Sequence, residues 1–204
     1  RACEIESLAD GRVSFSLVTP VGALGISMKL LGRHNVMNAV ASAAVALEAG
    51  AGLDHVKRGL ESALPVQGRL SVVEGLGGAL ILDDSYNASP NSFRAAIDVL
   101  ASFPGQQILI TGDMKELGNE SRKAHQSVGE IAKRAGVGSL WAIGDYASLV
   151  VEAFGEGGIV FEDQQSLVEY ASRQLDADSV VLVKGSRGAK MESVVNDLRG
   201  GEEA

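Results

Sequence analysis

The stretch "SVVLVKGSRGAKMESVVNDLR" (179–199) indicates how the second half of the chain folds. Its apolar start predicts a buried strand over 179–185, and a helix follows over 189–199. The same order of strand and helix occurs three times before it, at 108–111 and 120–136, at 139–144 and 146–154, and at 158–162 and 164–175. Short apolar strands that alternate with helices are typical of a parallel sheet covered on both faces, so we expect a doubly wound α/β domain.

The first half of the chain has a different pattern. Two strands are expected at 12–20 and 21–30, and helices at 34–50, 53–64 and 89–103, with two short strands around a Gly-rich turn within 69–84. The segment "PGQQ" (104–107) interrupts this pattern. We therefore expect two domains, 1–103 and 104–204, with Pro104–Gly105 as a candidate hinge.

Composition narrows the class of protein. The 204 residues are 46% hydrophobic but only 4% aromatic, and the net charge is −8, which argues against nucleic acid or an anionic membrane as the main partner. No apolar run reaches the roughly 18 residues of a membrane helix. Cys3 is the only cysteine, which excludes an internal disulfide and fits a cytoplasmic location. Because the first residue is Arg1 and not Met, we expect a piece of a longer protein or a processed product.

The turn "KGSRG" (184–188) is a candidate anion site. It places Lys184, Ser186 and Arg187 between a strand and the start of a helix, where backbone N–H groups are free to bind a carboxylate or a phosphate. A turn that served only to reverse the chain would need the glycines but not the cations.

A second candidate is "ALILDDSYNASPNS" (79–92), where a buried strand ends in two aspartates. One aspartate could cap the next helix, but two acids with Tyr86 and Asn87 exceed what capping needs. A carboxylate at the carboxyl end of a strand is well placed to bind ribose hydroxyls. Arg69, after a glycine, could bind a phosphate or a carboxylate with two hydrogen bonds, although most such arginines are solvated or paired with an acid.

A third candidate is "HNVMN" (34–38) at the start of a helix. His34 lies at or before the cap, and the carboxamides of Asn35 and Asn38 could bind a base or a ribose there. Alternatively, Asn35 could be a simple N-cap and Asn38 a polar residue at a helix–helix contact. No G-x-x-x-x-G-K-[ST] loop occurs in the chain, and the three histidines are scattered, which argues against a His-based metal site.

Taken together, these stretches resemble the Mur ligases, the ATP-dependent amide-forming enzymes of peptidoglycan synthesis. The similar segments occur in order along nearly the whole chain: "GRHNVMNAVASAA" (32–44), "GRL" (68–70), "DDSYNASPNS" (83–92), "GDMKELG" (112–118) and "VKGSRGAKME" (183–192). The third is similar to the signature of the family members that add D-Ala-D-Ala. Ser89 stands where that signature usually has Asn, and Ala189 where the last segment usually has Met.

The resemblance implies the end of a central P-loop-type ATPase domain followed by a Rossmann-like C-terminal domain, with the phosphate-binding loop upstream of Arg1. It implies ATP and Mg²⁺, and UDP-MurNAc-tripeptide and D-Ala-D-Ala as substrates of a monomer. The residues implied at the nucleotide are His34, Asn35, Asn38, Arg69 and Asp84. Arg69, Tyr86 and Asn87 are implied near the reacting groups, and Lys184, Ser186 and Arg187 at the dipeptide carboxylate.

Two alternatives stay open at this point. One is another Mur or folylpolyglutamate-type ligase, although "DDSYNASP" differs from the segments usual in those enzymes. The other is a non-catalytic module that binds a small anion or a protein partner. Assays of activity and binding separate the two classes. A ligase fragment should regain ligation only when the missing domains are supplied, whereas a binding module would bind its own ligand with high affinity unaided.

Overall fold

The computed structural model describes residues 1–200, and the chain divides after Pro65 into two compact units. This division differs from the boundary expected at residue 104. The strands within 69–84 pair with the sheet of the second unit, so the segment from Val66 onward belongs to it. Pro104 and Gly105 consequently join a helix to a strand inside one unit.

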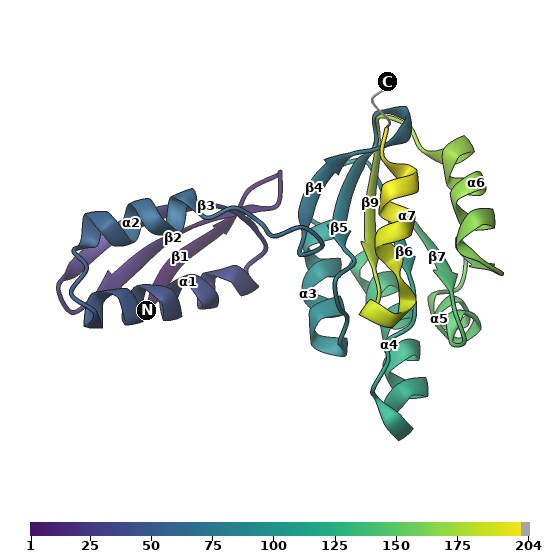
Figure 1. The fold of residues 1–204 in the computed structure, drawn as a ribbon, viewed down its shortest axis with the longest axis horizontal. Coiled ribbons are helices and arrows are strands. Elements are labelled where there is room, and N and C mark those ends of the chain that lie inside the picture. Colours follow the sequence, from purple (N-terminus) through teal and green to yellow (C-terminus); the bar gives the residue numbers. More distant parts are fainter. Residues whose placement is uncertain (201–204) are drawn as a thin grey trace. The chain divides into compact units, whose positions relative to one another are not determined.

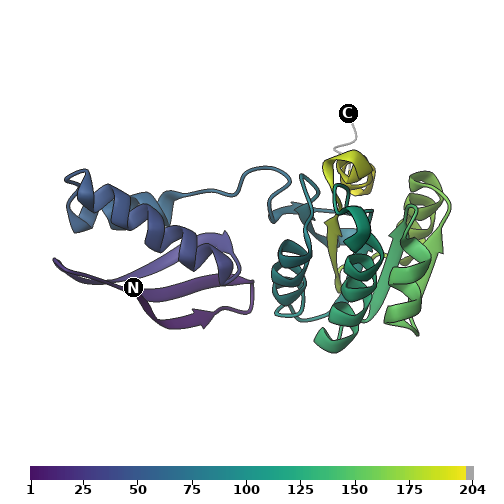
Figure 2. The ribbon, with the colours of Figure 1, turned by 90° about the horizontal axis from the view of Figure 1, so that it is seen from below.

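Unit 1, Arg1–Pro65, is a three-stranded antiparallel sheet with two helices on one face (Figure 2). Its elements are β1 (Ala2–Ser7), β2 (Arg12–Thr19), β3 (Gly22–Leu31), α1 (His34–Glu48) and α2 (Leu53–Ser62). Alternate residues of β2 point to the helices, and Val13, Phe15 and Leu17 are almost fully buried. This period of two is what one buried sheet face requires. The sequence pattern had not indicated β1.

Unit 2 is a six-stranded sheet in the order β4-β5-β9-β6-β7-β8 (Figure 1). Its strands are β4 (Ser71–Glu74), β5 (Leu80–Asp84), β6 (Gln106–Thr111), β7 (Ser139–Ile143), β8 (Gly158–Phe161) and β9 (Ser179–Lys184). Its α-helices are α3 (Pro90–Leu100), α4 (Ser121–Ala135), α5 (Ala147–Phe154), α6 (Gln164–Gln174) and α7 (Met191–Leu198). Strands β5 to β9 are parallel to one another, and β4 pairs antiparallel with β5 at the edge.

Helices cover both faces of this sheet, which confirms the expected doubly wound α/β fold. Helices α3, α4 and α5 lie on one face and α6 and α7 on the other (Figures 1 and 2). Strand β9 is buried along its whole length, as expected for a central parallel strand. The chain runs from β6 outward to β8 and returns to β9 on the opposite side of β6. This reversal of strand order is the place where doubly wound sheets bind ligands, beyond the carboxyl ends of the strands.

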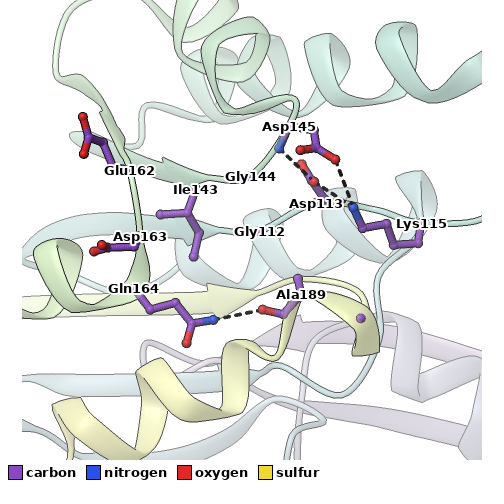
Figure 3. A pocket seen from close by; sticks show the side chains of 11 residues that line it. Gly112, Asp113, Lys115, Ile143, Gly144, Asp145, Glu162, Asp163, Gln164 and Ala189 are labelled. Carbon is purple, nitrogen blue, oxygen red and sulfur yellow. Dashed lines mark hydrogen bonds and ion pairs between the residues drawn. The ribbon is translucent and has the colours of Figure 1, made fainter.

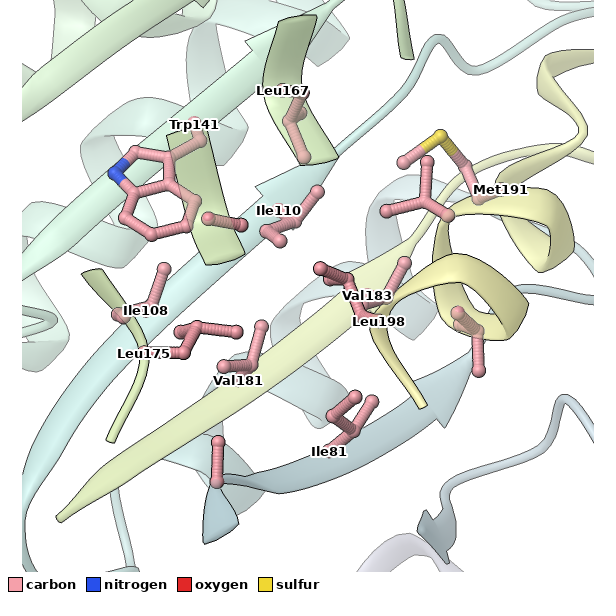
Figure 4. Close-up of a cluster of buried hydrophobic side chains, with 14 of the residues drawn as sticks. Ile81, Ile108, Ile110, Trp141, Leu167, Leu175, Val181, Val183, Met191 and Leu198 are labelled. Carbon is pink, nitrogen blue, oxygen red and sulfur yellow. The ribbon is translucent and has the colours of Figure 1, made fainter. Parts of the chain in front are cut away.

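The core under α6 and α7 is aliphatic, as the composition suggested. Residues of β5, β6 and β9 pack against Leu167 of α6 and against Met191 and Leu198 of α7 (Figure 4). Trp141, the single tryptophan, lies within this cluster with 3% of its surface exposed. The expected helices of residues 1–200 agree with the observed ones to within three residues at each end. In this described part of the chain, no helix combines the length and apolarity that crossing a bilayer would need.

Candidate functional site

The loops after the carboxyl ends of β5, β6, β7, β8 and β9 carry most of the polar residues singled out from the sequence. The loop after β5 begins with Asp83 and Asp84, and the structure gives these two neighbours different roles. They sit at the end of one strand, so their side chains point to opposite faces of the sheet. Asp83 is 1% exposed, whereas the Asp84 side chain keeps 14% of its surface exposed.

Asp83 holds the "GRL" turn against the loop after β5. Its carboxylate accepts hydrogen bonds from the Gly68 N–H at 3.2 Å, the Ser85 N–H at 3.2 Å and the Ser85 hydroxyl at 2.6 Å. The Tyr86 N–H in turn donates to the Gly68 carbonyl. Asp83 therefore satisfies local backbone groups of two loops. The alternative in which one of the two aspartates caps the next helix is wrong, because the N-cap of α3 is Ser89.

Arg69 is brought onto Tyr86 by this turn. The guanidinium carbon lies 4.6 Å from the centre of the Tyr86 ring, a cation–π arrangement. Gly68 has a φ of +74°, and a Cβ at this position would lie 3.1 Å from the Tyr86 Cβ. A glycine before Arg69 thus permits the close approach of the two segments, and two residues expected near the reacting groups lie together.

Lys184, at the end of β9, is the partner of Asp84. Its ammonium donates to Asp84 Oδ2 at 2.6 Å and to the Asn87 carbonyl at 2.9 Å, and it lies 5.4 Å from the centre of the Phe93 ring. Lys184 is 1% exposed. Burial lowers the pKa of this ammonium from its ordinary value, and the Asp84 carboxylate opposes that effect. The structure thus brings together residues that the sequence had assigned to a nucleotide and to a dipeptide.

The rest of the "KGSRG" turn packs onto the loop after β6. The Ser186 N–H and hydroxyl both donate to the Asp113 carbonyl, at 3.0 and 2.7 Å. A Cβ on Gly185 would lie 2.6 Å from the Met191 Cγ, so glycine allows this turn to lie against the start of α7. Arg187 is exposed. Of the three residues expected at a carboxylate, Arg187 is the one whose charged end lies at the surface.

A pocket of about 360 Å³ opens at the carboxyl ends of β6, β7, β8 and β9 (Figure 3). This volume is within the range of about 300–1,000 Å³ that is usual for small-ligand sites. Both signs of charge line it: Lys115 supplies a cation, and Asp145, Glu162 and Asp163 supply carboxylates. A pocket of this chemistry can hold a small zwitterion.

Asp113 organises one wall of this pocket. Its carboxylate accepts hydrogen bonds from the backbone N–H groups of Asp145 at 3.0 Å and Tyr146 at 3.2 Å, and from Lys115 at 3.1 Å. The hydrogen bond between Lys115 and the Asp113 carboxylate is the largest cause of a raised pKa of Lys115. Asp113 thus receives the Lys115 ammonium and at the same time holds the start of the loop after β7.

His125 was missed as a structural residue because its contacts with Met114 and Tyr146 form only when the loops after β6 and β7 fold against α4. It is 2% exposed, its ring stacks on Tyr146 with 4.3 Å between centres, and Nε2 accepts a hydrogen bond from the Met114 N–H. Nδ1 lies 2.7 Å from the Ser121 carbonyl oxygen, which accepts from it. His125 therefore fixes the loop that bears Asp113 and Lys115. Its place on the apolar face of the predicted helix 120–136 was the available signal.

The three candidate residues of unit 1 lie in the first two turns of α1. The Asn35 carboxamide donates to the Leu31 carbonyl at 2.8 Å, and the Asn38 carboxamide donates to Asn35 Oδ1 at 2.9 Å. His34 is the first residue of the helix, and the N-cap is Arg33. The alternative in which Asn35 caps the helix is therefore wrong, and the two asparagines bond to each other on one side of α1.

Residues 1–200 do not contain a group of three or more His, Cys, Asp or Glu side chains arranged to hold a metal ion. Mg²⁺ is usually held by one or two carboxylates together with waters and substrate phosphates, so a Mg²⁺ ion shared with ATP stays compatible with these residues.

Comparison with known proteins identifies the family of the chain. Residues 68–187 match the family model described as "Mur ligase, glutamate ligase domain", and this segment coincides with most of unit 2. The chain belongs to the Mur ligase family, as the ordered motifs indicated.

Individual proteins of known structure or activity are also similar to this chain. The chain is 42% identical over 187 residues to the UDP-N-acetylmuramoyl-tripeptide–D-alanyl-D-alanine ligase of Escherichia coli, which covers 91% of this chain and 41% of that enzyme. Among solved structures, MurF of Acinetobacter baumannii superposes with a TM-score of 0.88 at 33% identity, over 97% of this chain and 44% of that one. MurF of Thermotoga maritima in complex with ADP gives a TM-score of 0.83 at 25% identity, over 96% and 45%.

The chain thus spans about two fifths of the length of the curated relatives it matches. A part of this length does not by itself show the activity, substrates or partners of a whole ligase.

Proposed function

We propose that the chain is the C-terminal portion of an ATP-dependent ligase that adds D-Ala-D-Ala to UDP-MurNAc-tripeptide in peptidoglycan synthesis. The observation that carries the proposal is the joining of three separate motifs at one edge of the sheet. Asp83 binds the "GRL" turn, Arg69 lies over Tyr86, and Lys184 of the "KGSRG" turn pairs with Asp84. The similarity to D-Ala-D-Ala-adding ligases, one of them solved with ADP, supports the same reaction.

The proposed reaction has two steps. The γ-phosphoryl group of ATP passes to the terminal carboxylate of the tripeptide, which gives an acyl phosphate and ADP. The amine of D-Ala-D-Ala then attacks the acyl carbon, a C–N bond forms, the C–O bond to phosphate breaks, and the amine loses a proton. A cytoplasmic location and a monomeric state stay predictions. Mg²⁺ is implied by the resemblance, and when bound it would neutralise charge on the transferring phosphoryl group.

We assign the residues to this reaction as follows. In unit 1, His34, Asn35 and Asn38 offer polar groups for the base or ribose of ATP. In unit 2, Asp84 is proposed for the ribose hydroxyls and Arg69 for the phosphates. Arg69 is a suitable phosphate ligand because its planar guanidinium can form two parallel hydrogen bonds.

The dipeptide is proposed to bind in the pocket beyond β6, β7, β8 and β9. Its ammonium would face Asp145, Glu162 or Asp163, and its carboxylate would face Lys115 and the exposed Arg187. The Ser186 hydroxyl donates to the Asp113 carbonyl, so it can take part in carboxylate binding only through its loop.

Ligation by the complete protein encoded by the gene tests this proposal. We expect ADP release that requires both UDP-MurNAc-tripeptide and D-Ala-D-Ala. Arg69→Met should raise the KM for ATP, Arg69→Lys should do so less, and Arg94→Met, at an exposed position of α3, should leave it unchanged. ADP release that does not depend on D-Ala-D-Ala would refute the assigned reaction, and an unaltered KM in Arg69→Met would refute the role of Arg69.

A further inference from the structure

We propose that Lys184 is a positioning residue for the loop after β5, where it holds the Asp84 carboxylate and the Asn87 carbonyl, and that it does not bind the dipeptide carboxylate. The substrates named in this inference rest on the proposed function. The arrangement of Lys184 itself rests on contacts within unit 2.

The Lys184 ammonium is already engaged by groups of the protein. A lysine ammonium has three N–H donors and no acceptor. Two donors are taken by Asp84 Oδ2 and the Asn87 carbonyl, and the centre of the Phe93 ring lies 5.4 Å from Nζ. The residue is 1% exposed. Because Nζ is buried among these groups, a substrate carboxylate could reach it only if some of them moved.

The place of Asp84 in the sheet carries the second step. Asp84 pairs with Lys184 in the register of the parallel strands β5 and β9, so the two side chains leave adjacent strand ends. The 2.6 Å bond then fixes the direction of the Asp84 carboxylate. A carboxylate that must meet two ribose hydroxyls benefits from such fixing, because preorganised groups lose less freedom when the ligand binds.

The Asn87 carbonyl carries the third step. Asn87 lies between Tyr86 and the Ser89 N-cap of α3. The hydrogen bond from Lys184 connects the Asn87 backbone to the end of the central strand β9. The same ammonium thus sets the course of the loop that bears Tyr86 and Asn87. Loss of Lys184 should displace the residues assigned to the nucleotide more than the lining that β6, β7 and β8 give to the pocket.

Kinetics of the complete ligase separate the two roles. Lys184→Met removes the charge and the donors but keeps the length of the side chain, and we expect it to raise the KM for ATP about ten- to hundredfold with the KM for D-Ala-D-Ala unchanged. Arg187→Met, three residues along, should raise the KM for D-Ala-D-Ala instead. An increase in the KM for D-Ala-D-Ala alone in Lys184→Met would overturn the inference. A lower thermal stability with both KM values unchanged would also overturn it, since the role would then be structural only.

Acylation of the unmodified protein tests the inference without a variant that must fold. Acetic anhydride, followed by mass spectrometry, should modify Lys184 far more slowly than the exposed Lys190, with or without D-Ala-D-Ala. Rapid modification of Lys184 that D-Ala-D-Ala suppresses would overturn it. If the wild type forms no amide, the proposed function fails by that result alone, and the acylation rates still decide whether Lys184 is held by Asp84 or open to a substrate.

Discussion

Lys184 and Asp84 form an ion pair with 2.6 Å between Nζ and Oδ2, although 100 residues separate them in the chain. They end two neighbouring parallel strands, and both are largely withdrawn from solvent. The pair connects the loop after β5 to the turn after β9. These two segments had been assigned to different ligands, and a single contact makes them one structural element.

The free energy of unfolding should show that this pair acts as a unit. Removing one member of a buried ion pair costs about 3–5 kcal/mol, because the other charge stays buried without a partner. Lys184→Met should thus destabilise unit 2 strongly, and Lys184→Met combined with Asp84→Asn should be less unstable than the sum of the single changes. Urea unfolding followed by Trp141 fluorescence measures each variant, because Trp141 is buried in unit 2. Strictly additive losses would show that the two residues do not interact.

Asp83 should contribute to stability more than its neighbour Ser85. Asp83→Asn keeps the size of the side chain but replaces one acceptor oxygen by an N–H donor, which would face backbone donors that now bond to the carboxylate. The expected loss is about 1–3 kcal/mol. Ser85→Ala removes one bond of this group and should cost about 1 kcal/mol. The same fluorescence measurement applies, and equal stability of Asp83→Asn and the wild type would show that the carboxylate does not hold the "GRL" turn.

Gly129 should resist substitution because two helices meet at this position. A Cβ there would lie 2.1 Å from the Val150 carbonyl oxygen of α5. Gly129→Ala should consequently destabilise unit 2 by about 1–3 kcal/mol, in spite of the better helix propensity of alanine. Gly59→Ala on α2 is the matched control, since nothing lies within 4 Å of its Cβ and a gain of about 0.5–1 kcal/mol is expected. Circular dichroism during urea unfolding measures both, and a stabilised Gly129→Ala would contradict the observed helix packing.

Because Asp163 caps α6, the stability of the N-terminus of this helix should depend on pH. Its carboxylate accepts the Ser166 N–H at 2.8 Å, and this bond lowers the pKa of Asp163 from its ordinary value of 3.8. The stabilising contribution is therefore present above pH 3.8 and is lost as the pH falls through the lowered pKa. Asp163→Asn keeps a capping oxygen without a titration, so its stability should approach that of the wild type in this acidic range. NMR titration of the Asp163 carboxyl carbon checks the pKa, and a value at or above 3.8 would refute the cap.

Local pattern predicted most of the secondary structure, and it did so for physical reasons. Each helix from α3 to α7 follows an apolar strand and begins near a Gly, Pro or capping residue, and such signals act over a few residues. β1 was missed because "ACEIES" alternates weakly and depends on pairing with β2 for its structure. The domain boundary was misplaced for a related reason. Pro104 and Gly105 do interrupt the chain, but only the pairing of β5 with β9 shows that the chain on both sides belongs to one sheet.

The sequence by itself determined the order of helices and strands, the doubly wound fold of the second unit, the family and the candidate motifs, because these depend on residues close together in the chain. The tertiary structure decided which polar groups meet. Asp83 and Asp84 are adjacent and chemically identical, yet one binds backbone N–H groups and the other binds Lys184. Their partners are set by the alternation of side chains across β5 and by the insertion of β9 beside it, and strand order in a sheet is not written in any local stretch of sequence.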